Sequence, residues 1–130
     1  MVSYTSPPIE VTHARDAPIT RADVEFEGVE HGGPSFEARV FLNNPNAGPE
    51  TPPTDENGYA GSFHVYGFGL QDGSAAAVPM RRSMIVTDAV KRLLPATSRF
   101  VVTVVPVLPD RVAEAAGDVL KIQNVAIRVS

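Results

Sequence analysis

Histidine is the residue type in this chain best suited to metal binding or proton transfer, and there are three: His13, His31 and His64. They lie far apart in the sequence, no two are spaced to share one turn of a helix, and no Cys accompanies them. Preformed zinc sites normally show close pairs of such ligands. We therefore expect solvated or hydrogen-bonded histidines, no metal site and no cofactor. His64 is the strongest candidate for a role, because it shares a predicted strand face with Tyr66 and Phe68.

Other catalytic signatures are incomplete. The sequence has no Gly-x-Ser-x-Gly elbow, no Walker loop and no Gly-x-Gly-x-x-Gly pattern. Glycines flank Phe68, but this fragment fits a strand end that turns sharply better than a phosphate cradle. The carboxylates Glu25, Glu27, Asp55 and Glu56 fall on a solvated strand face or in a loop, where carboxylates are ordinarily found. We predict no catalytic residue and do not expect an enzyme.

One basic pair, Arg81 and Arg82, precedes an apolar run and is a candidate for contacting an anion or a carboxylate of a partner. The plainer interpretation is that both are solvated, since exposed charges contribute little binding energy.

The composition limits the class of protein. With 130 residues, 43% hydrophobic and 20% charged, the chain has the size and balance of one globular domain. Its net charge of -4 gives no basic footprint for nucleic acid or for an anionic membrane, so neither is expected as a partner. The absence of Cys excludes disulfides, and no secretory signal is visible at the N-terminus, so a cytoplasmic location is expected.

The predicted elements are mostly strands. Residues 22–29 and 36–42 alternate apolar and polar side chains, and we expect them to form a hairpin across a turn at 30–34, with Arg39 opposite Glu25 or Glu27. Further strands are predicted at 59–68, which is aromatic on both faces, at 100–108 and at 119–129. These last two ranges carry irregularities: Pro106 indicates an edge or bulge, and a shift of apolar phase indicates a bulge at 123–124.

The segments between the strands are of two kinds. Residues 43–57 contain Pro, Asn and Gly with hardly any large apolar residue, which is typical of a surface loop long enough to be functional. Residues 84–86 are expected to be buried. Thr87 or Asp88 is then expected to cap a short helix whose apolar residues Val90, Leu93 and Leu94 share one face.

This pattern predicts an all-β fold, an antiparallel β-sandwich or partly open barrel with one short helix. We expect residues 1–20 to be an N-terminal extension, partly ordered, and residues 21–130 to form the sandwich.

Several phrases resemble one known domain when they are taken in order. They are residues 24–31 (VEFEGVEH), 35–45 (SFEARVFLNNP), 58–67 (GYAGSFHVYG), 85–90 (IVTDAV) and 101–107 (VVTVVPV). Together they resemble the C-terminal β-sandwich that follows the dicopper domain in tyrosinases, polyphenol oxidases and related haemocyanin-like proteins. The resemblance extends from about residue 21 to residue 130. The chain departs from it at 68–73, where a segment of the family with His and Gly is replaced by FGLQDG.

The resemblance implies a role without chemistry. In that family six histidines on a helical domain hold the two copper ions, and the sandwich packs over the entrance and can limit substrate access. With three histidines and no helical pair, this chain is not expected to be a type-3 copper oxidase by itself.

Three hypotheses follow. The leading one is a non-catalytic accessory domain that presents the 59–68 edge and the 43–57 loop to a protein partner, for which a dicopper oxidase domain is one candidate. Its expected contact residues are Tyr59, Phe63, His64, Tyr66 and Phe68. The second is a structural subunit that self-associates through the same aromatic face as a homo-oligomer. The third is a small enzyme or ligand-binding sandwich with a pocket near His64.

Overall fold

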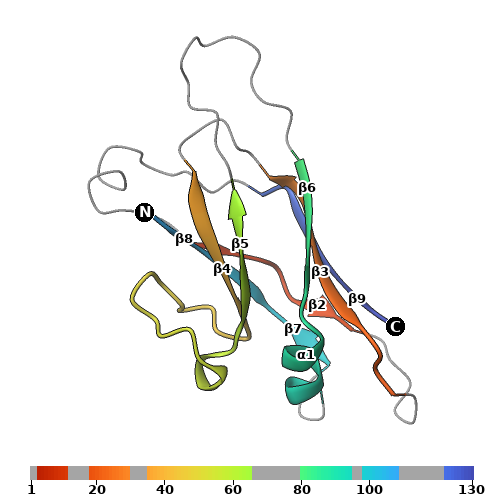
Figure 1. Cartoon of the computed structure of the whole chain (residues 1–130). Coiled ribbons are helices and arrows are strands. Elements are labelled where there is room, and N and C mark those ends of the chain that lie inside the picture. The colour runs from red at the N-terminus through yellow and green to blue at the C-terminus, as the bar shows by residue number, and fades with distance from the viewer. Residues whose placement is uncertain (1–2, 12–17, 30–34, 66–79, 95–97, 109–121) are drawn as a thin grey trace.

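The computed structural model describes residues 3–11, 18–29, 35–65, 80–94, 98–108 and 122–130 and shows two antiparallel sheets (Figure 1). The four-stranded sheet has the order β1 (Tyr4–Thr5), β8 (Val102–Val107), β4 (Phe36–Leu42) and β5 (Tyr59–Val65). The three-stranded sheet has the order β6 (Met80–Ile85), β3 (Ala22–Val29) and β9 (Asn124–Val129). A short ladder joins β2 (Ile9–Glu10) to β7 (Arg99–Phe100). The predicted all-β sandwich is confirmed, and the sheets do not close into a barrel.

The apolar rows of the central strands face each other between the sheets. On β3 every second residue from Ala22 to Phe26 is completely buried, and on β4 the same holds for Ala38 and Val40. Their neighbours Asp23, Glu25, Glu37 and Arg39 are half-buried on the outer faces. The alternation of side chains thus produces one shared core, as the period of two predicts.

The predicted hairpin between residues 22–29 and 36–42 is wrong, because β3 and β4 belong to different sheets. Arg39 pairs with Glu37 of its own strand at 2.8 Å, and Glu25 pairs with Arg128 of β9 at 2.9 Å. Each strand has an apolar row that fits a sheet interior equally well, so the pattern fixed the face of each strand and not its neighbour. The turn expected at 30–34 lies outside the described residues.

The N-terminal segment forms two short ladders, β1 with β8 and β2 with β7. Tyr4 and Thr5 pair with Val104 and Thr103, and the buried hydroxyl of Ser6 accepts a hydrogen bond from the Val102 amide at 2.9 Å. Beyond β2, the side chain of Val11 is buried in the core. The described residues of 1–20 therefore pack with the sandwich.

The expected short helix is α1 (Thr87–Leu93), which directly follows β6 (Figure 1). The expected cap is not found: Val86 is the N-cap residue, and the Thr87 hydroxyl instead accepts a hydrogen bond from the Ala22 amide at 3.1 Å. The expectation of burial at 84–86 holds for Val86 only. Ile85 points to the outer face of the sheet and is 60% exposed. No helix among the described residues is long and apolar enough to cross a membrane.

The irregularities predicted from Pro106 and the last strand have counterparts in the structure. Pro106 pairs with Ala38 of β4 on one side. On its other side β1 pairs only with Thr103 and Val104 of β8, so no described strand pairs with Pro106 there. At the start of β9, Asn124 is the register partner of Glu27, and the Gln123 amide also donates to the Glu27 carbonyl at 2.9 Å. Two residues therefore oppose one, which is the arrangement of a β-bulge. The part of the predicted strand before residue 122 lies outside the described residues.

Candidate functional site

The expected contact residues on β5 divide into two groups. Phe63 points inward, its ring 5.0 Å from that of Phe26 across the two sheets, and Tyr59 lies edge-on to Phe41 at 5.5 Å on the outer face. Both side chains are half-buried, so much of their apolar surface is already used within the chain. His64 is exposed on the outer face. Tyr66 and Phe68 lie outside the described residues.

The two arginines, Arg81 and Arg82, have different surroundings. Arg81 is largely exposed and reaches Glu27 at 3.4 Å. The Arg82 guanidinium lies 5.8 Å from the centre of the Phe63 ring and donates a hydrogen bond to the backbone carbonyl of His64. Arg82 therefore connects β6 of one sheet to β5 of the other, with a cation–π contact in support.

The 43–57 loop is held by its own hydrogen bonds. Asn43 adopts a left-handed conformation (φ 58°), donates from its amide to the Val101 carbonyl at 2.8 Å, and accepts from the Val101 amide through its side-chain oxygen at 2.8 Å. Further along, Ala47 is buried against Phe41 and Val105 in a second apolar cluster on the outer face of the four-stranded sheet. The loop thus covers part of that face in a fixed conformation.

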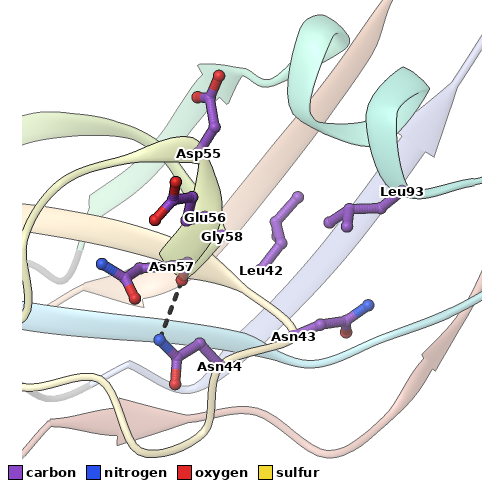
Figure 2. Close-up of a pocket in the computed structure, with 8 residues that line it drawn as sticks. All are labelled: Leu42, Asn43, Asn44, Asp55, Glu56, Asn57, Gly58 and Leu93. Atoms are coloured by element: carbon purple, nitrogen blue, oxygen red, sulfur yellow. Dashed lines mark hydrogen bonds between the residues drawn. The ribbon is translucent and has the colours of Figure 1, made fainter.

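A pocket of about 340 Å³ lies where this loop returns to the sheet (Figure 2). Its polar wall comes from the loop and the 3-10 helix η1 (Asp55–Asn57), and its apolar part from the side chains of Leu42 and Leu93. The Asn44 side-chain amide donates to the Asn57 carbonyl at 3.0 Å, which fixes the two sides relative to each other (Figure 2). The full lining is Leu42, Asn43, Asn44, Asp55, Glu56, Asn57, Gly58 and Leu93.

The pocket is not the one expected near His64, which is absent from its lining. Its acidic groups are solvated: Asp55 is 75% exposed and lies 3.5 Å from the Arg92 guanidinium. Among the described residues no group of three His, Cys, Asp or Glu side chains is placed to hold a metal ion.

The one strained backbone position of the loop, at Asn43, was not singled out from the sequence. Asn after a strand is the signal that would have indicated it, because Asn tolerates left-handed backbone.

The outer face of the three-stranded sheet is occupied by ion pairs. Three carboxylates in a row along β3 are each paired with an arginine, at distances of 2.9 to 3.4 Å: Arg21 with Asp23, Arg128 with Glu25 and Arg81 with Glu27. These charges satisfy one another in solvent, so this face is the less suitable of the two for burying a partner.

Burial affects one ionisable group in the N-terminal segment. Desolvation raises the pKa of the Tyr4 phenol above its ordinary value. Tyr4 packs against the main core and does not line the pocket, so this shift belongs to stability.

Comparison with known proteins gives a match in structure. No protein-family model and no curated protein matches the sequence. Among solved structures, latent aurone synthase (polyphenol oxidase) from natural source superposes with a TM-score of 0.64 at 13% identity, over 98% of this chain and 24% of that chain. The recombinantly expressed latent enzyme superposes with a TM-score of 0.63 at 12% identity, over the same shares. The chain thus spans about a quarter of these polyphenol oxidases and shares the fold of that part.

Proposed function

We propose that this chain is a non-catalytic accessory domain that binds and covers a protein partner, and that the partner is a dicopper oxidase domain. The observation that carries the proposal is the fold match, which covers nearly all of this chain and only 24% of the polyphenol oxidase chains. The phrases of sequence that resemble the C-terminal sandwich of the same oxidases support it independently. A domain of that kind acts by position, because the copper chemistry belongs to the helical domain.

The surface that fits this role combines the outer side of β5 with the 43–57 loop. His64 and the η1 carboxylates are exposed there, so a partner surface can reach them. The loop is already ordered by backbone hydrogen bonds, such as that from Asn43 to Val101. Binding therefore requires little further ordering, which favours affinity.

The polarity of this surface indicates the character of the partner's side. Asp55 and Glu56 at η1 are both exposed, and together they make the loop end acidic. A complementary patch on the oxidase domain would carry Lys or Arg, because opposite charges steer association and fix register.

A binding experiment tests the proposal. A dicopper oxidase domain from the same organism, prepared without any sandwich domain of its own, is titrated against this chain by calorimetry. We expect a one-to-one complex, and Glu56→Lys should weaken it by roughly threefold or more, because it reverses a charge at the interface. Ser83→Lys is the matched control, since Ser83 is exposed on the face of the other sheet and should leave affinity unchanged. Absence of binding, or equal loss in both variants, would refute the proposed surface.

A further inference from the structure

The two sheets differ in how their edges are protected. On one side of the sandwich β5 and β6 run side by side (Figure 1), and Arg82 of β6 caps the carbonyl of His64 on β5. Met84 of β6 fills the space over Gly61 of β5, where a Cβ would lie 3.4 Å from its sulfur. These contacts hinder the addition of another strand. Among the described residues, β9 has no comparable cover: it pairs with β3 alone.

Within β9 itself few features prevent pairing, because the bulge lies at its start. Its six residues, NVAIRV, contain no Pro and no Lys, and the register with β3 is regular from Asn124 to Val129. Natural edge strands are normally short, bulged, or interrupted by such residues. Its inward side chains are incompletely covered: Ile127 and Val129 are half-buried, whereas Val24 and Phe26 on β3 are completely buried. A strand added to β9 would extend the sheet over this row.

The direction of the backbone groups follows from the ladder. Ser130 and Arg21 exchange both backbone hydrogen bonds, at 2.9 and 3.2 Å. Since such pairs alternate along an antiparallel ladder, Arg128 and Ala126 also turn their amides and carbonyls toward β3. The amides and carbonyls of Val125, Ile127 and Val129 therefore point away from β3, toward a side where no described strand pairs with them.

Val125 and Val129 lie at equal distances along β9 on either side of Ile127, so the strand can pair with an antiparallel copy of itself centred on Ile127. We propose that β9 pairs with β9 of a second copy of the chain, antiparallel, about a two-fold axis at Ile127. Ile127 then lies opposite itself and Val125 lies opposite Val129, so all three outward-pointing residues exchange hydrogen bonds, about six in total. This dimer does not depend on the proposed function, and its interface lies on the opposite side of the fold from the β5 edge (Figure 1).

Charge is compatible with this register. Each Arg128 lies opposite Ala126 of the other copy, so the two guanidinium groups do not face each other. The ion pair between Arg128 and Glu25, at 2.9 Å, stays within each copy. Shifting the register by two residues would leave Val129 without a β9 partner, since it would then lie opposite Gln123. The axis at Ile127 is thus the register that pairs the whole strand.

A pair of substitutions at Ala126 separates dimerisation from folding. Ala126 neighbours Glu25 within the chain and would oppose Arg128 across the dimer. Ala126→Glu should therefore tighten the dimer and Ala126→Lys should weaken it, by roughly two- to thirtyfold in the dissociation constant. The melting temperature of the dilute monomer should move the other way, with the Lys variant higher. Sedimentation equilibrium measures the dissociation constant of the dimer. A chain that stays monomeric at its highest soluble concentration, or variants that shift together, would overturn the proposal.

Cross-linking tests the register, and the absence of native Cys makes it unambiguous. Residues 126 and 128 would face each other as a non-hydrogen-bonded pair, with Cα atoms about 4.5 Å apart, which a disulfide can span. Under mild oxidation, a mixture of Ala126→Cys and Arg128→Cys chains should form the mixed dimer severalfold faster than either chain alone forms its own. Equal rates, or faster linking of Ala126→Cys with itself, would exclude the axis at Ile127.

Discussion

At the scale of single residues, the loop that shapes the candidate site depends on two positions with left-handed backbone. Asn43 leaves β4 with φ 58°, and Gly58 enters β5 with φ 81°. The amide of Leu42, the residue before Asn43, donates to the Gly58 carbonyl at 2.8 Å, and this hydrogen bond closes the loop at its base. The position of η1, and so of the pocket wall, is set by these residues.

Replacing Gly58 with Ala should destabilise the fold strongly. A Cβ there would lie 2.2 Å from the Leu42 carbonyl oxygen, and the positive φ adds strain for any side chain. We expect a loss of roughly 2–4 kcal/mol in the free energy of unfolding, measured by urea denaturation. Gly48→Ala is the control, because nothing lies within 4 Å of its Cβ position, and it should change stability by less than about 0.5 kcal/mol. Equal losses would show that the loop base is not a fixed point.

Tyr4 gives a prediction in alkaline solution. Its pKa is raised by burial, so the folded state holds the phenol proton more tightly than the unfolded state does. The resulting stability is fully present below the unfolded pKa of about 10 and is lost as pH rises through the folded pKa. Tyr4→Phe should therefore lose less unfolding free energy than the wild type between about pH 8 and pH 11. Parallel pH profiles for the two proteins would contradict this.

At the scale of elements, the sandwich is held along one side by contacts between β5 and β6. Phe63 packs on Phe26 from the facing sheet, and Arg82 covers the Phe63 ring while capping His64. Arg82, which was expected to contact a partner, thus joins the two sheets instead.

Removing this contact should loosen the end of β5. Arg82→Ala is expected to cost about 1–3 kcal/mol of unfolding free energy and to speed amide exchange near His64, because a charged hydrogen bond and a cation–π contact are lost together. Arg81→Ala, next in sequence, removes only an exposed ion pair and should cost less than about 0.5 kcal/mol. If the two substitutions cost the same, the contact has no special role.

Sequence patterns predict structure at this scale only where the interactions are between residues close together in the chain. The alternation in 22–29 and 36–42 and the spacing of Val90 and Leu93 correctly predicted two strands and α1, because those patterns are local. The neighbour of each strand was not predictable in the same way, since β3 and β4 each satisfy the same pattern in either sheet. The pocket also escaped prediction, as it joins a loop residue to Leu93 through tertiary packing alone.

At the scale of the whole molecule, the two broad faces differ. The three-stranded sheet presents paired charges to solvent, while the four-stranded sheet carries an apolar cluster partly covered by an ordered loop. The likeness to a quarter of the polyphenol oxidase chains extends over 98% of this chain, so the whole sandwich, and not one motif, carries the resemblance. This arrangement is the physical basis of the accessory role that we propose.

The most direct test is the effect of the chain on oxidase activity. A dicopper oxidase domain from the same organism, without a sandwich of its own, is assayed on a diphenol while this chain is titrated in. We expect saturable inhibition that grows with the size of the substrate, because a covering domain restricts access to the copper site. Glu56→Lys should require more protein for the same effect. Activity that is unchanged at every concentration of the chain, with the assay responsive to a known inhibitor, would contradict it.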